Sequence, residues 1–241
     1  MDNGAEYTIT LPCHGHTYGL KQGMNPGAPS LRQISAVRGR PWIPILCSVL
    51  WLGTTVAAMA MLWLYENVPG PSLAVPATWP EASAIPREAG MATLVMFAHP
   101  RCPCTRASIG ELANVIEQSG GRVRAHVVFY RPAGSAESWL KTDLWRSAAA
   151  IPGVEVRSDE ENAEAGLFGA ATSGFVVLYD AAGRLEYSGG ITGERGHSGD
   201  NLGEDAVIEG IKGQKSPVDK MPVLGCSLYG GKSACLARSE K

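Results

Sequence analysis

Three patterns of hydrophobic and polar residues follow one another along the 241-residue chain. Residues 1–40 contain many glycines and prolines and show no apolar period, which predicts a disordered tail. Residues 41–65 are then 25 consecutive uncharged and mostly apolar positions. From residue 91 onward, short apolar runs alternate with amphipathic stretches. The pattern therefore divides the chain into a tail, one long apolar segment and a globular region.

The uncharged segment 41–65 is long enough to cross a membrane as a helix. Its 25 residues would extend roughly 37 Å, against about 30 Å for the hydrocarbon core of a bilayer. Trp42 at one end and Trp63 and Tyr65 at the other suit the two membrane interfaces. A buried core helix is the alternative, but core helices are seldom this long without a charge. We predict a single transmembrane helix over 41–65.

The basic residues around this helix predict its orientation. Those that precede it are Lys21, Arg32, Arg38 and Arg40, and the next one after it is Arg87. The positive-inside rule then keeps 1–40 in the cytoplasm and exports the rest of the chain. Ala58-Met59-Ala60 resembles a cleavage site, and a cleaved signal peptide would also export the remainder. We expect a single-pass protein of the inner (cytoplasmic) membrane with a periplasmic globular region.

Composition sets the other domain limits. Five prolines lie between Pro69 and Gly90, and we interpret 66–90 as a semi-rigid linker. Residues 91–213 have the size of one ordinary domain, and 214–241 form a C-terminal loop extension. The net charge of −2 gives no basic surface for nucleic acid.

Within 91–213 the periodicity alternates between strands and helices. Apolar runs predict strands at 91–98, 123–130, 154–156, 175–179 and 185–187, with a hairpin turn at 180–183. Amphipathic stretches predict a helix that ends before Gly120 and further helices at 135–150, 160–168 and 201–212. This alternation indicates an α/β domain, a mixed sheet with helices on both faces.

Two cysteines and a proline, Cys102-Pro103-Cys104, lie between the first strand and the first helix. Backbone N–H groups and the helix dipole favour a thiolate there, and Arg101 and Arg106 add positive charge. Residues two apart in a helix point about 200° apart, so the thiols would diverge inside one. We therefore expect Cys102 at the cap and Pro103 at the first helical position. A disulfide between these cysteines would be strained, oxidising and labile.

The order of these elements, the cysteines after the first strand and the closing hairpin resemble the thioredoxin-like fold over nearly all of 91–213. The motif Phe97-Ala-His-Pro-Arg-Cys-Pro-Cys104, with Gly189-Gly-Ile-Thr192 and Gly196-His-Ser-Gly-Asp-Asn201, is most similar to the membrane-anchored thioredoxin-like proteins known as RedB. The resemblance implies thiol–disulfide exchange with a protein partner and makes Cys102 the nucleophile.

The chain also departs from the thioredoxin pattern. Thr105 stands where Cys-x-x-Cys has its second cysteine, and Met96 replaces the buried acid of the preceding strand. The loop that carries a cis-proline in thioredoxins reads Thr172-Ser173-Gly174, where a glycine can admit a substrate backbone.

Two functions use the same cysteines. In the first, Cys102 attacks a partner's sulfur and Cys104 resolves the mixed disulfide, with no cofactor. Arg101, Pro103, Ser173 and Gly174 would then contact the partner. In the alternative, the chain handles copper or zinc through Cys102, Cys104 and either His99 or His197, a nitrogen and sulfur set that suits Cu(I) and Zn(II). A docking domain without catalysis is a third hypothesis.

Two more cysteines, Cys226 and Cys235, lie near the C-terminus. We predict a structural disulfide between them, and a second redox pair that exchanges with Cys104 is the alternative. Arg195, His197 and Asp200 could orient a substrate in the cleft, but we favour their interpretation as solvated loop charges.

Overall fold

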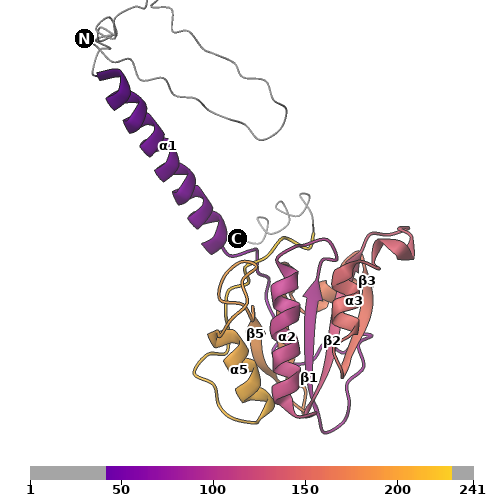
Figure 1. Ribbon diagram of the computed structural model, residues 1–241. Coiled ribbons are helices and arrows are strands. Elements are labelled where there is room, and N and C mark those ends of the chain that lie inside the picture. Colours follow the sequence, from indigo (N-terminus) through magenta and orange to yellow (C-terminus); the bar gives the residue numbers. More distant parts are fainter. Residues whose placement is uncertain (1–41, 230–241) are drawn as a thin grey trace, which may run out of the picture. The chain divides into compact units, whose positions relative to one another are not determined.

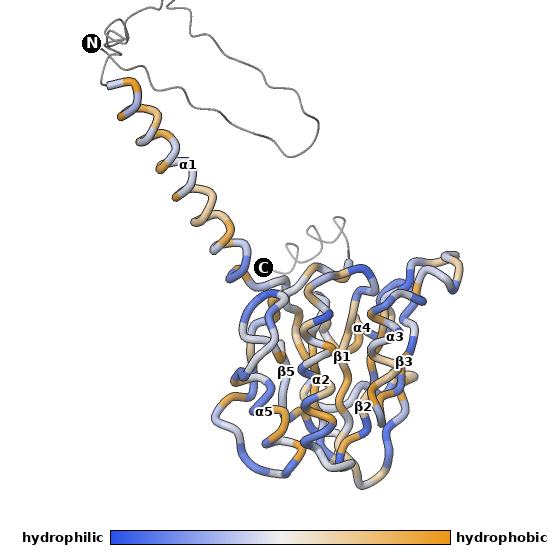
Figure 2. The backbone as a smooth tube through the Cα atoms, in the orientation of Figure 1, coloured by the Kyte–Doolittle hydropathy of each residue, from blue (hydrophilic) through white to orange (hydrophobic). Residues whose placement is uncertain are grey.

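The structure is a computed structural model that describes residues 42–229. The predicted disordered tail 1–40 and Cys235 lie outside the described residues. Helix α1 (Trp42–Asn67) covers the predicted transmembrane segment, and orange marks its hydrophobic residues in Figure 2. By length and composition it is a candidate membrane span.

Five strands form one mixed sheet in the order β3-β2-β1-β4-β5 (Figure 1). They are β1 (Ala92–Ala98), β2 (Val123–Arg131), β3 (Val154–Glu160), β4 (Phe175–Tyr179) and β5 (Leu185–Gly189). The first three are parallel, whereas β4 and β5 run antiparallel to their neighbours. With flanking helices this is a thioredoxin-like fold, which confirms the predicted fold class.

The helices are α2 (Thr105–Ser119), α3 (Asp143–Ala149), α4 (Ala163–Leu167), α5 (Leu202–Ile211) and the 3-10 helix η2 (Glu137–Trp139). The helix predicted over 135–150 is thus two helices. Thr142 separates them, since its hydroxyl accepts a hydrogen bond from the Trp145 N–H and caps a new helix. The predicted strand 154–156 is longer than expected, because β3 pairs with β2 up to Glu160.

Alternate residues of the strands face opposite sides of the sheet, as the pleat requires. We call one side the helical face. It carries Leu94, Met96 and Leu178, and α2, α3 and α5 pack on it. We call the other side the irregular face, and it carries Phe97 and Tyr179.

The stretch 66–90, which composition predicts to be a linker, packs on the irregular face over much of its length. Ile85 is buried there, and Val75 and Trp79 pack against the same cluster. The Trp79 N–H donates to the Gly183 carbonyl at 2.8 Å. These contacts make the segment part of the domain, because prolines stiffen a chain without preventing its apolar side chains from docking.

The C-terminal residues 214–229 form no helix or strand, and their last part, from Val223 onward, completes the cover of the irregular face. Val223 and Leu228 are buried in its cluster. The Val223 carbonyl also accepts a hydrogen bond from the Gly70 N–H at 2.8 Å. The two ends of the globular region are therefore joined across this face.

Candidate active site

The Cys102-Pro103-Cys104 turn lies between the carboxyl end of β1 and the start of α2. The Cys102 N–H donates to the His99 carbonyl, and the Cys102 carbonyl accepts from the Thr105 N–H. Cys104 is the residue that precedes α2. The helix thus begins two residues later than we predicted, and Pro103 lies before it. Because the turn lies outside the helix, its two thiols need not point in the divergent directions that a helix would impose on residues two apart.

A third cysteine reaches this turn from the C-terminal segment. The Cys226 carbonyl accepts a hydrogen bond from the Ser173 N–H at 2.8 Å, and the Leu228 N–H donates to the Ala171 carbonyl at 2.9 Å. Ser227 forms an antiparallel bridge with Thr172 between them. The segment 226–228 is thus held on the loop that precedes β4.

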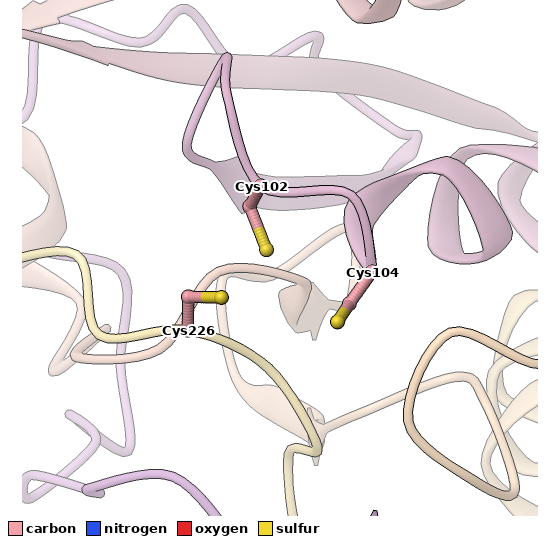
Figure 3. A group of neighbouring side chains, drawn as sticks. All are labelled: Cys102, Cys104 and Cys226. Carbon is pink, nitrogen blue, oxygen red and sulfur yellow. The ribbon is translucent and has the colours of Figure 1, made fainter.

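The three Sγ atoms of Cys102, Cys104 and Cys226 all lie within 4.8 Å of one another. Figure 3 shows the three side chains converging, two from the turn and one from the C-terminal segment. Cys102 is 2 % exposed, whereas Cys104 and Cys226 are half-buried. We call these residues the cysteine cluster. From the sequence, Cys226 is considered only together with Cys235, as a structural disulfide or as a redox pair that exchanges with Cys104, because nothing in its local pattern points to residue 102.

The cluster separates its thiols by pKa. Burial raises the pKa of Cys102, but hydrogen bonds from Thr105 and Cys226 outweigh it and hold that pKa below its usual value. Burial and the Cys102 charge raise the pKa of Cys104. Burial and a hydrogen bond to Cys102 raise the pKa of Cys226 to about 12. Cys102 is therefore the thiol best suited to be the thiolate.

The hydroxyl of Thr105 connects the cluster to the predicted partner-binding loop. Its Oγ1 lies 2.7 Å from Ser173 Oγ, which accepts a hydrogen bond from the His99 N–H. Gly174 has a φ of +93° and donates its N–H to the Phe97 carbonyl. Thr105 is a site residue that the sequence marks only as a departure from Cys-x-x-Cys.

Arg195 is the cation beside the cluster. Its charge opposes the rise in the pKa values of Cys104 and Cys226, and its guanidinium donates to the Gly225 carbonyl at 2.7 Å. Its interpretation as a solvated loop charge is therefore wrong. The predicted cations lie elsewhere: Arg106 pairs with Asp143, and Arg101 lies over the Trp139 ring.

Neither predicted histidine ligand joins the group of potential metal ligands in the described part of the chain. The His99 ring stacks on Tyr130, and its Nδ1 accepts a hydrogen bond from the Arg101 N–H. Burial and the Arg101 charge lower the pKa of His99. His197 is exposed and its Nδ1 lies 3.7 Å from Glu194. The structure thus brings together three sulfur ligands, which differ from the mixed nitrogen and sulfur set of the alternative function.

No protein-family model matches the chain, and no curated protein matches it. Several solved structures are similar to it. A hypothetical protein from Sinorhizobium meliloti is 22% identical, with a TM-score of 0.48, over 68% of this chain and 96% of that one. An uncharacterized conserved protein from Geobacillus kaustophilus is 18% identical, with a TM-score of 0.49, over 70% and 96%. A secreted disulfide oxidoreductase from Mycobacterium tuberculosis is 13% identical, with a TM-score of 0.36, over 52% and 83%.

Proposed function

We propose that this chain is a membrane-anchored thiol–disulfide oxidoreductase in which Cys102 is the nucleophile and Cys104 a resolving thiol. The observation that carries the proposal is the cysteine cluster, in which three thiols converge, hydrogen bonds lower the pKa of Cys102, and burial raises the pKa values of its two neighbours. A lowered pKa provides thiolate at neutral pH, and adjacent thiols provide the second sulfur that exchange requires.

In the first step the Cys102 thiolate attacks one sulfur of a partner's disulfide. A bond forms between Cys102 and that sulfur, and the partner's other sulfur leaves as a thiolate. The negative charge of Cys102 is then gone, and with it one cause of the raised pKa of Cys104. Cys104 can lose its proton and attack the Cys102 sulfur, so that a Cys102–Cys104 disulfide forms and the partner leaves as a dithiol.

The residues around Cys102 provide the contact surface for a protein partner. Arg101 and Pro103 are exposed beside the turn, and Ser173 and Gly174 supply backbone next to it. The candidate span α1 would anchor the chain in an inner membrane, with the globular region in the periplasm. This arrangement is the one expected of the RedB-like proteins that the sequence resembles.

A redox titration of the full chain in detergent micelles tests the proposal. The protein is equilibrated in glutathione buffers without metal, and its free thiols are alkylated and mapped by mass spectrometry. We expect a reversible two-thiol couple that includes Cys102 and is absent in Cys102→Ser. The Cys47→Ser variant, which lacks a thiol of α1, should titrate like the parent. If Cys102 stays alkylated at every ratio, the exchange mechanism is wrong.

The three convergent sulfurs favour one second candidate, the handling of a soft metal ion. Three thiolates within 4.8 Å suit Cu(I) or Zn(II), although the predicted His99 and His197 are not among them. Metal analysis of the full chain purified without oxygen separates the two functions. About one ion per chain, lost in Cys226→Ser and retained in His197→Ala, would support metal handling.

A further inference from the structure

The segment 225–228 lies on the loop around Ser173 and Gly174, which we propose as a contact surface for the partner protein. Hydrogen bonds to Ser173 and Ala171 hold it antiparallel to the loop before β4, as an added strand would be held. Its Cys226 is placed against Cys102, at the position that a partner's sulfur would take. The chain's own C-terminal segment thus occupies the expected place of a substrate.

This placement is fixed from both sides of Cys226. A Cβ on Gly225 would overlap the Ser173 carbonyl oxygen, so the close approach requires glycine there. Arg195 holds the Gly225 carbonyl on one side, and buried Leu228 anchors the other. Asn162 also donates a hydrogen bond to the Leu228 carbonyl. Cys226 is therefore held at Cys102 by the fold.

We propose that Cys226 is an internal partner thiol that closes on Cys102 and takes the larger share of substrate release. The inference rests on the proposed function and assigns a third thiol to the same site. Cys104 is tied to Cys102 through a single proline, so closing that small ring strains the turn. Cys226 comes from a separate segment that is already positioned, and its closure has no such constraint.

Release of the substrate by Cys226 needs no further reactant. A partner displaces the segment, and the Cys102 thiolate attacks one sulfur of the partner's disulfide, so that a mixed disulfide forms and the other sulfur leaves as a thiolate. The segment returns, and the Cys226 thiolate attacks the Cys102 sulfur. A Cys102–Cys226 disulfide forms, the partner's sulfur leaves, and it takes the proton that Cys226 has lost. Two electrons pass from Cys102 and Cys226 to the partner's disulfide.

The test uses the full chain in detergent micelles with glutathione disulfide as the partner. All variants carry Cys235→Ser to remove a competing thiol. The reaction is stopped by alkylation at intervals, and mass spectrometry follows the Cys102–glutathione adduct and the peptide joined to Cys226. The variant Cys104→Ser should form the Cys102–Cys226 bond and release glutathione more slowly than the parent by less than about twofold, because only the minor resolving thiol is lost. The variant Cys226→Ser should release it about tenfold more slowly.

Two glycine variants test the placement without removing a thiol. Gly225→Ala should slow closure by about tenfold, because its Cβ pushes the segment off Ser173. Gly193→Ala is the matched control, since a Cβ there would make only an ordinary contact with Asn201, and it should react like the parent. Closure at the parental rate in Gly225→Ala would overturn the role of the placement.

The double variant Cys104→Ser with Cys226→Ser separates this inference from the proposed function. It should accumulate the Cys102–glutathione adduct, because both resolving thiols are absent. If the adduct forms there but the parent pairs Cys102 with Cys104 and leaves Cys226 alkylated, Cys226 is not the partner thiol and the proposed function stands. If no adduct forms in the double variant, the proposed function itself fails.

Discussion

The two faces of the sheet are covered in different ways. On the helical face, α2, α3 and α5 bury the apolar residues of the strands. On the irregular face the cover consists of residues 69–85, the five-residue helix α4 and the C-terminal segment up to residue 229. Both faces are closed to water, yet only the first is closed by long regular helices.

The difference matters for chemistry, because the cysteine cluster draws on both covers. Cys104 and Thr105 come from the start of α2, on the side of the helical cover. Cys226 comes from the irregular cover, with Gly225 held by Arg195. An irregular segment that only a few hydrogen bonds hold can be displaced more readily than a helix, since fewer bonds break. The irregular cover is therefore the side on which a partner can enter.

The difference between the two covers is tested most directly by replacing one tryptophan in each of them. Trp79 packs edge-on against Phe168, with ring centroids 5.0 Å apart, and Trp145 packs against Phe129 on the helical face at 5.4 Å. Both are half-buried. We expect Trp79→Ala and Trp145→Ala each to lower the free energy of unfolding by about 3 kcal/mol. Urea unfolding of the full chain in micelles, followed by circular dichroism, measures both.

If residues 69–85 only linked the domain to α1, Trp79→Ala would leave the unfolding curve unchanged while Trp145→Ala shifted it. That outcome would contradict the claim that residues 69–85 cover the irregular face and stabilise the domain. Leu73→Ala is the control within the same segment, because its exposed side chain lies outside the buried cluster. It should leave stability within about 0.5 kcal/mol of the parent.

The helices that cover the helical face carry a pair of carboxyl groups, which should make the stability of this side of the domain depend on pH. Burial and a hydrogen bond with Glu111 raise the pKa of Glu204 to about 7. The folded state then holds a proton that the unfolded state has lost, so stability falls as pH rises from about 4.5 to about 7 and levels off above that. We expect Glu204→Gln, which keeps a donor toward Glu111, to be about 2 kcal/mol more stable than the parent at pH 8.

Unfolding free energies measured between pH 5 and pH 8 check this slope. Glu209→Gln, on the same helix, is the control and should keep the parental slope. If the unfolding free energy of Glu204→Gln changed with pH as steeply as that of the parent, Glu204 would not retain its proton in the folded state.

The helical cover was largely predictable, and the irregular cover was not. The periods of the strands and of α2 and α5 are local, so they are visible in the sequence. Trp79 and Val75 stand among prolines with no period, and their burial depends on residues about 100 positions away, such as Tyr179. The same holds for the site. The spacing of Cys102 and Cys104 identifies them as a pair, but Cys226 joins them only through a long-range pairing with Ser173.

A smaller effect is expected at Thr105, where the two covers meet. Thr105 and Cys226 both hydrogen-bond to Cys102 and lower its pKa. Thr105→Val removes a hydroxyl donor, so the pKa of Cys102 should rise by about one unit, or about 1.4 kcal/mol. The rate of Cys102 alkylation against pH, in a Cys104→Ser background, reports the midpoint. An unmoved midpoint would mean that Cys226 alone stabilises the thiolate.

The smallest effect is expected at Thr93, in β1. Its hydroxyl is fully buried and has no hydrogen-bond partner among the residues that the structure describes. Thr93→Val replaces the hydroxyl with a methyl group of similar size, so a desolvated polar group is lost and the packing is kept. We expect the free energy of unfolding to rise by about 0.5–1 kcal/mol, with no change in the Cys102 titration. A loss of stability instead would show that the Thr93 hydroxyl is hydrogen-bonded. Thr93 in the sheet and Thr105 beside Cys102 would then both depend on their hydroxyls, and the contrast between the two sites would be lost.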